Sequence, residues 1–316
     1  MAWYHDRMTN AGNEVKALDN LPIADRIGIS THFLPATHGE SIFDAIRMVH
    51  EAGFRGFAIV PTLDQAQLGY PRNYPNVGID LFESTAEDIS RLKDALSVFD
   101  WVTVHGPHLD WNLSSANRHL RELTARYFDR CLEFAIELGA AAMTYHYGTP
   151  TWGYIRSGDT IQDPNLFYAK HLMALSANVP LGYEVGTFDM LKYVCDRVDG
   201  WGVNLDLGHA YMAAGSDDGF YRFIDEFGDR LVEIHHNGVN HYWGGYMEHQ
   251  PPHMNNTIDY QGAYTRLREI DYDGPIICEI QGHDIAQVIE HCIESKEMII
   301  GIWEGTRSLV ERYNRA

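Results

Sequence analysis

The chain has few basic residues and no hydrophobic run long enough to cross a membrane. Its 44 acidic residues against 24 basic ones give a formal charge of -20 at pH 7. Because affinity for nucleic acids and anionic lipids depends on lysine and arginine, we expect neither a nucleic acid nor a membrane as a partner. The N-terminal residues lack the apolar core of a signal peptide, so we expect a cytoplasmic protein.

Cysteine is also scarce, and the four cysteines lack the CxxC spacing of zinc knuckles. Each one lies within an apolar helix or strand pattern: Cys131, Cys195, Cys278 and Cys292. This placement predicts buried thiols in a reducing compartment rather than a disulfide framework.

Short apolar runs alternate with amphipathic helical patterns along the chain, which is typical of an α/β fold. The runs predicted to be strands are residues 26–30, 56–60, 101–105, 142–146, 181–184, 203–206, 231–235 and 275–279. A doubly wound sheet would normally carry a glycine-rich phosphate turn after its first strand, and none is present. Eight strand–helix units therefore predict a single parallel (β/α)8 TIM barrel over residues 23–316, preceded by an N-terminal arm of residues 1–22.

Four of the predicted strands end in a side chain that can bind a metal ion. These side chains are Glu184, Asp206, His235 and Glu279. Active sites of TIM barrels form at the carboxyl ends of the strands, so we expect the four to converge there. Two glutamates, an aspartate and a histidine make a site for a divalent cation with open positions.

Several segments, taken together, match one family. They are the stretch from His105 to Leu113, His146-Tyr-Gly148, Glu184, Asp206-Leu-Gly-His209, Ile234-His235-His-Asn237, the stretch from His253 to Asp259, and Glu279. On these segments the chain resembles the xylose isomerase-like TIM barrel superfamily. That superfamily includes sugar isomerases and epimerases similar to tagatose 3-epimerase and, more distantly, endonuclease IV.

The resemblance implies one divalent metal ion, with Glu184, Asp206, His235 and Glu279 as its ligands. Manganese is the expected ion, and magnesium, cobalt and zinc are alternatives. The resemblance also implies that Glu184 and Glu279 exchange protons with opposite faces of the substrate. His209, three residues beyond Asp206, is expected to hydrogen-bond a substrate hydroxyl.

Endonuclease IV-like members hold three zinc ions and draw further ligands from positions that match His105, His146, His209 and His253. This chain keeps those histidines but has Pro251 where that enzyme has an aspartate. Because proline offers no side-chain ligand, we expect one metal ion, or at most two.

Other histidines lie within helical patterns and are expected to be structural or to lie on the surface: His50, His119, His171 and His291. His32, near the end of the first strand, is a candidate for lining the mouth of the barrel.

Isomerisation next to a carbonyl requires removal of a carbon-bound proton and stabilisation of the enediolate, which a divalent cation provides. A hydride shift of the xylose isomerase kind uses a second metal site and a lysine. None of the five lysines falls at a predicted strand end. The sequence therefore favours an isomerase or epimerase that works by proton transfer.

The segments after the seventh and eighth strands contain no lysine or arginine over residues 236–258 and 280–294. TIM barrels usually bind a substrate phosphate there, so we expect an unphosphorylated sugar, keto sugar or glycoside. Aromatic side chains that could stack on a sugar ring are expected to form a lid. Candidates for substrate contact include Trp111, Trp152 and Trp243.

The aromatic lid also suits a metal-dependent lyase of the same fold. Examples are a keto-inositol dehydratase and a 3-keto C-glycoside deglycosidase, which works with a small partner subunit. A zinc phosphodiesterase and a non-catalytic metal-containing scaffold are two further hypotheses. Related barrels dimerise or tetramerise, so we expect a homo-oligomer.

Overall fold

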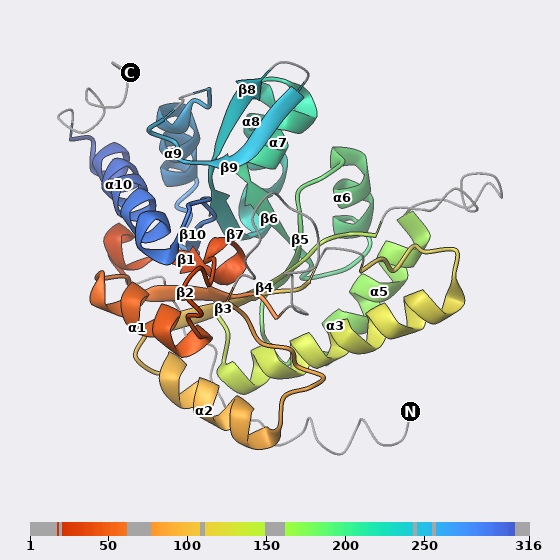
Figure 1. Ribbon diagram of the computed structural model, residues 1–316. Coiled ribbons are helices and arrows are strands. Elements are labelled where there is room, and N and C mark those ends of the chain that lie inside the picture. Colours follow the sequence, from red (N-terminus) through yellow and green to blue (C-terminus); the bar gives the residue numbers. More distant parts are fainter. Residues whose placement is uncertain are drawn as a thin grey trace.

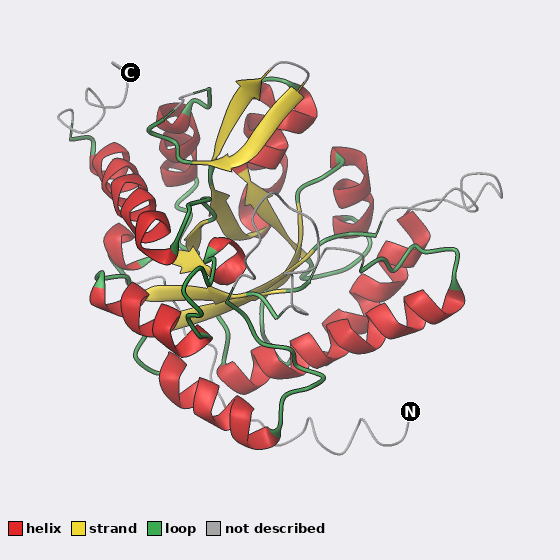
Figure 2. Ribbon diagram, viewed as in Figure 1, coloured by secondary structure: helices red, strands yellow, loops and turns green. Residues whose placement is uncertain are grey.

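Eight parallel strands close into a barrel that is surrounded by helices (Figures 1 and 2). The computed structural model describes residues 18, 21–61, 77–107, 111–148, 162–242, 245–254 and 257–306. Around the barrel the strands follow the order β1-β10-β7-β6-β5-β4-β3-β2. The prediction of a single α/β TIM barrel is confirmed.

The barrel strands are β1 (Ile27–Ser30), β2 (Gly56–Ile59), β3 (Trp101–His105), β4 (Ala142–Tyr145), β5 (Leu181–Glu184), β6 (Gly202–Asp206), β7 (Leu231–His236) and β10 (Ile276–Cys278). The described α-helices are α1 (Ile42–Glu51), α2 (Ala86–Leu96), α3 (Arg118–Leu138), α5 (Gln162–Leu175), α6 (Phe188–Cys195), α7 (Leu207–Ala214), α8 (Asp218–Phe227), α9 (Tyr260–Glu269) and α10 (Ile285–Glu304). Short 3-10 helices are η2 (Ile23–Asp25), η3 (Thr31–Phe33) and η5 (Gly228–Arg230). Each barrel strand lies within one residue of its predicted bounds, because strands buried on both faces have continuous apolar runs.

Helix ends follow local capping chemistry. Ser41 and Asp44 form a capping box at the start of α1, where side-chain oxygens accept backbone N–H groups. α3 ends at Gly139, whose φ of 62° lies in the left-handed region that glycine adopts without strain. Such capping residues fix where a helix begins or ends, and so where the chain can turn towards the next strand.

The amino-terminal end of the barrel is filled by Trp101, the first residue of β3. A Cβ atom on Gly56 of the neighbouring strand would lie 1.9 Å from Cζ2 of Trp101, so only glycine fits there. Leu18 of the predicted arm packs into the same buried cluster, with Ala58 and Trp101. The inner end of the arm therefore packs against the barrel, while residues 1–17 lie outside the described residues.

Two elements after the strands were not predicted. The segment after β7 forms an antiparallel hairpin of β8 (Gly238–Tyr242) and β9 (Gly245–Gln250), which lies against α7 (Figure 1). This segment carries aromatic residues expected to form a lid, and its polar and apolar residues do not alternate as in a half-buried strand, so the sequence predicts no strand there. The helix α7 starts directly after β6 and extends for eight residues, so His209 lies in its first turn.

The cysteines and lysines lie where the sequence predicts them. All four cysteines are buried. Lysines of the described residues lie on the surrounding helices α2, α5, α6 and α10 and not at strand ends: Lys93, Lys170, Lys192 and Lys296. None of the helices in the described parts of the chain combines the length and the apolar character needed to span a bilayer.

Candidate metal centre and active site

The four predicted metal ligands come together at the carboxyl ends of neighbouring barrel strands. Glu184 and Asp206 are the last residues of β5 and β6, and Glu279 follows β10 directly. His235 is the next-to-last residue of β7. Each of the four residues is at most 2% exposed, so their charges face one another rather than water.

One ring nitrogen of His235 faces all three carboxylates. Its Nδ1 lies 3.3 Å from Oε2 of Glu279, 3.6 Å from Oε2 of Glu184 and 3.8 Å from Oδ2 of Asp206. This buried nitrogen and Oε1 of Glu279 have no hydrogen-bond partner among the described residues. Buried polar atoms are nearly always paired, so converging donors without hydrogen bonds fit a divalent cation between them.

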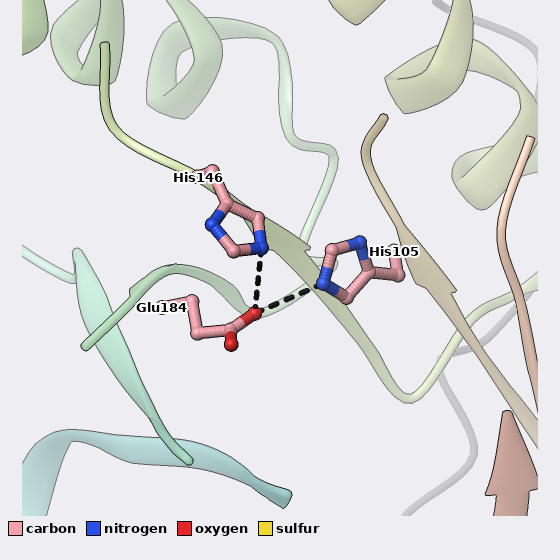
Figure 3. A group of neighbouring side chains, drawn as sticks. All are labelled: His105, His146 and Glu184. Atoms are coloured by element: carbon pink, nitrogen blue, oxygen red, sulfur yellow. Dashed lines mark hydrogen bonds and ion pairs between the residues drawn. The ribbon is translucent and has the colours of Figure 1, made fainter. Parts of the chain in front are cut away.

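Glu184 also contacts two histidines, one from β3 and one just beyond β4 (Figure 3). Its Oε2 lies 2.9 Å from Nε2 of His105 and 3.0 Å from Nε2 of His146. Nδ1 of His105 lies 2.7 Å from the carbonyl oxygen of Gly106, which can only accept a hydrogen bond. Nδ1 therefore donates to this carbonyl, and although burial opposes it, the hydrogen bond to Glu184 and the charge of Glu184 raise the pKa of His105. A metal ion bound at Nε2 would displace the proton on that nitrogen. His32 lies close by, with its ring centre 6.0 Å from that of His105, as expected for a residue at the mouth.

A third donor group lies where the hairpin meets α7. Nε2 of His209 is 3.0 Å from Oε1 of Glu184, and Nδ1 is 2.9 Å from Oε2 of Glu248. His209, Glu248 and His249 offer three ligand atoms within 4.8 Å of one another. Pro251 offers no side-chain ligand, but the hairpin brings the carboxylate of Glu248 to His209.

The sequence pattern gave no signal for this pair, because adjacent strand residues normally point to opposite faces. His249 has a φ of 56°, in the left-handed region that residues other than glycine rarely adopt. This local break in the strand allows both Glu248 and His249 to approach His209.

The neighbouring histidines set the protonation of the carboxylates. Burial alone would raise the pKa of Glu184, but His146, His235 and the hydrogen bond from His105 hold that pKa well below its usual range. Burial likewise opposes ionisation of Glu279, yet the charge of His235 holds its pKa well below normal. The two glutamates are therefore ionised at neutral pH.

The pKa values of Asp206 and the histidines shift in other directions than those of the two glutamates. Burial raises the pKa of Asp206. Burial would lower the pKa of His209 and of His235, but the surrounding carboxylates raise both pKa values well above normal. For His146 burial prevails and the pKa is lowered. A cation bound among the carboxylates would compete with protons on His209 and His235, because metal ligation needs the unprotonated ring.

A fourth carboxylate, Glu233, lies behind His235 in the interior of the barrel and is fully buried. Its Oε1 lies 2.8 Å from Nε2 of His235, and accepts from Oγ1 of Thr144 and Nδ2 of Asn204, each at 3.3 Å. Metal-binding histidines commonly donate their second N–H to a carboxylate, which fixes the ring orientation. Glu233 was missed, although an acidic residue two positions before His235 in a buried strand is the signal that could have identified it.

Some of the predicted contacts lie elsewhere. His253 contacts Glu294 of α10, with Nδ1 and Oε2 2.8 Å apart, and groups with His291 and Glu294. Trp111 stacks on Tyr127 of α3 at a ring-centre distance of 4.5 Å and packs against the hydrophobic core. Two predicted lid residues lie outside the described residues: Trp152 and Trp243.

Solved structures share this architecture. A D-tagatose 3-epimerase-like protein superposes with a TM-score of 0.69 at 21% identity, covering 89% of this chain and 99% of that protein. The 3-keto-D-glucoside 4-epimerase YcjR from E. coli gives a TM-score of 0.62 at 18% identity, covering 86% and 98%. A xylose isomerase-like TIM barrel protein from Mycobacterium smegmatis in complex with magnesium gives 0.63 at 16% identity, covering 88% and 96%. At these identities the likeness establishes the fold alone.

The family assignment rests on the sequence itself. Residues 46–298 match the family model described as xylose isomerase-like TIM barrel. The matched range contains all four predicted metal ligands and seven of the eight barrel strands. The chain belongs to the xylose isomerase-like TIM barrel family.

Proposed function

We propose that the protein is a divalent-metal-dependent isomerase or epimerase that acts on an unphosphorylated sugar or keto sugar. The observation that carries this proposal is the convergence of three carboxylates on Nδ1 of His235, at the end of the barrel where active sites of this fold form. The sugar epimerases among the structures of the same fold support the class of reaction.

Glu184, Asp206, His235 and Glu279 would hold the metal ion. A bound divalent cation supplies Lewis-acid stabilisation of negative charge on the substrate oxygens. Three carboxylates and one imidazole suit manganese, which we expect, and also accommodate magnesium, cobalt or zinc.

The protein's own side chains would move the proton. Glu184 and Glu279 lie on β5 and after β10, with β6 and β7 between them in the barrel, so they reach a bound substrate from different strands. One carboxylate takes the proton from the carbon next to the carbonyl, and the C–H electron pair becomes the double bond of an enediolate. Return of a proton to the opposite face of that carbon gives an epimer. Its return to the former carbonyl carbon, with transfer of the hydroxyl proton of the first carbon to the former carbonyl oxygen, gives an isomer.

His209 would position the substrate. Its ring lies between Glu184 and Glu248, at 3.0 Å and 2.9 Å. A ring N–H that exchanges one of these carboxylate contacts for a substrate hydroxyl would hold the reacting carbon against Glu184. The hairpin that carries Glu248 would limit access of water to this end of the barrel.

Deuterium exchange tests the proposal directly. Metal-free protein is incubated in D2O with a panel of ketohexoses and 3-keto glycosides, with and without added Mn2+, and label next to the carbonyl is followed by NMR. We expect exchange and epimerisation that require the ion and stop with a chelator. Glu184→Gln and Glu279→Gln should each reduce turnover at least about a hundredfold. Glu269→Gln, on the exposed side of α9, is the matched control.

Two outcomes would sink the isomerase proposal. Near-normal turnover by both active-site variants would remove Glu184 and Glu279 from the chemistry. Release of an aglycone from a 3-keto glycoside, without action on any ketohexose, would identify a lyase that uses the same base and metal.

The third donor group favours a second candidate, a multinuclear metal hydrolase. The groups His105–His146–Glu184, Glu184–Asp206–His235 and His209–Glu248–His249 could together hold more than one ion. The formal charge of -20 disfavours DNA as the substrate. Elemental analysis distinguishes the candidates: three zinc ions per chain with hydrolysis of bis(p-nitrophenyl) phosphate would favour the hydrolase.

A further inference from the structure

A cluster of donor atoms outside the barrel mouth takes no part in the proposed reaction. His291 and Glu294 lie three residues apart on α10, which places them on the same face of the helix. His253 reaches them from the turn that follows β9, and its ring centre lies 5.1 Å from that of His291. The three side chains offer ligand atoms within 4.8 Å of one another and share no residue with the groups around Glu184.

The two imidazoles turn buried nitrogens towards this cluster. Nδ1 of His253 and Nδ1 of His291 are shielded from water and have no hydrogen-bond partner among the described residues. Nδ1 of His253 lies 2.8 Å from Oε2 of Glu294, which is an ion-pair distance. Two buried ring nitrogens without a hydrogen bond are costly unless a further group binds them.

The surroundings favour a cation as that group. The carboxylate of Glu294 lies within 4.8 Å of a ring nitrogen of both His253 and His291, and its negative charge attracts a cation. Glu290, one turn earlier on α10, adds negative potential at both rings. The sequence contains no lysine or arginine from residue 269 to residue 295 that could supply positive charge locally.

We propose that His253, His291 and Glu294 form a second metal site, for a divalent transition-metal ion such as Zn2+, which ties the chain leaving the β8–β9 hairpin to α10. Two imidazoles and one carboxylate match the ligands of zinc and cobalt, whereas magnesium and calcium prefer oxygen ligands alone. Two donors on one zinc ion lie about 3 to 3.5 Å apart, so the three ligand atoms, which lie within 4.8 Å of one another, would have to adjust by about an ångström or less to bind the ion.

The position of the site gives the bound ion a mechanical role. His253 lies three residues after the end of β9, and the same part of the hairpin is joined to the segment before α10 by the hydrogen bond from Gln281 N to His249 O at 2.8 Å. An ion at His253 would add a second link between the hairpin and the segment around α10. Because β9 also carries Glu248 and His249, occupancy of this site restrains the donors at the barrel mouth. The site does not depend on the proposed sugar chemistry.

Zinc titration of the full chain tests the proposal. Metal-free wild type, His291→Gln and the control His283→Gln are titrated with Zn2+ by calorimetry, with stoichiometry checked by elemental analysis after dialysis. His283 is exposed near the start of α10 and its charge acts on His291, but it is not one of the three proposed ligands, so this variant controls for the loss of a nearby imidazole. We expect His291→Gln to bind one zinc ion per chain fewer than the wild type, and His283→Gln to match the wild type.

Hydrogen exchange locates the lost ion. In the wild type, Zn2+ should slow backbone exchange in residues 250–254 and in the middle of α10, and this protection should be absent in His291→Gln. If His291→Gln fails to fold by circular dichroism, Glu294→Gln takes its place with the same expected loss. Equal zinc stoichiometry in wild type and the folded variant, or unchanged protection of residues 250–254, overturns the proposal. Sugar isomerase activity is not a readout, so failure here is distinct from failure of the proposed function.

Discussion

The carboxylate of Glu233 is predicted to position His235, and its substitution should weaken metal binding without unfolding the protein. Glu233 is fully buried, and its Oε1 lies 2.8 Å from Nε2 of His235. Substitution of such a carboxylate behind a metal-binding histidine typically costs tenfold to a hundredfold in affinity, or about 1.4 to 2.7 kcal/mol. Glu233→Gln keeps an oxygen that can accept from Nε2 but loses the charge, so we expect a loss near the lower end of this range.

A second substitution separates charge from orientation. Glu233→Met fills a similar volume but offers no acceptor, so the His235 ring loses its fixed tautomer as well as the nearby charge. We expect a further loss of affinity and a fall of about 1 to 3 kcal/mol in the free energy of unfolding of the metal-free protein. For Glu233→Gln the metal-free protein should change by less than about 1 kcal/mol, because the hydrogen bond and shape are retained.

Chelator competition gives the dissociation constant for the ion, and urea denaturation of metal-free protein gives the free energy of unfolding. Imidazole nitrogen shifts of the Mg2+-loaded protein report whether the hydrogen of His235 stays on Nε2 when the ion is bound. The reasoning is refuted if Glu233→Gln and Glu233→Met both bind the ion as tightly as the wild type. Equal losses in the two variants, with the His235 tautomer unchanged in both, would attribute the effect to charge alone.

Three other perturbations have directions fixed by the structure. Burial lowers the pKa of His236 from 6.5 to about 3. Between these two pH values the unfolded chain binds a proton that the folded state does not. The free energy of unfolding should therefore fall by ~1.4 kcal/mol per pH unit as the pH drops from 6.5 towards 3. Urea midpoints at pH 7 and pH 5 measure this slope, which His236→Gln should flatten. Gly56→Ala places a methyl group 1.9 Å from Trp101 Cζ2 and should cost at least about 3 kcal/mol in denaturation experiments, part of which Trp101→Leu should restore. Glu248→Gln removes one of the groups that raise the pKa of His209, so NMR titration of the metal-free variant should give a lower value; an unchanged one would contradict the contact.

The barrel could be predicted because the local sequence of each strand marks where that strand begins and ends. β6 is a buried run that ends at Asp206, and β5 is another that ends at Glu184. In a parallel barrel every strand points the same way, so side chains at strand ends must meet at one end. The convergence of the four predicted ligands follows from strand order and requires no knowledge of loop structure.

The remaining donors depend on pairing that the sequence does not encode locally. Glu248 reaches His209 only because β9 pairs with β8, and His249 joins them only because its backbone adopts a φ of 56°. Glu233 was passed over for a different reason. A buried charge in the middle of a strand is unfavourable unless other groups form hydrogen bonds with it. The groups that do so here, Thr144 and Asn204, come from other strands and cannot be identified from the sequence around Glu233.

Asp206 shows how closely the fold and the proposed metal site depend on each other. Its Oδ1 accepts from the backbone N–H of His209 at 2.7 Å and so caps α7, while its Oδ2 accepts from Nδ2 of Asn237 at 2.7 Å. The cap fixes the first turn of α7, and with it the direction in which His209 points towards Glu184. The same carboxylate that would bind the ion therefore also places the residue proposed to orient the substrate. Loss of Asp206 would disturb the metal and the substrate together, whereas loss of Glu279 would leave α7 and His209 in place.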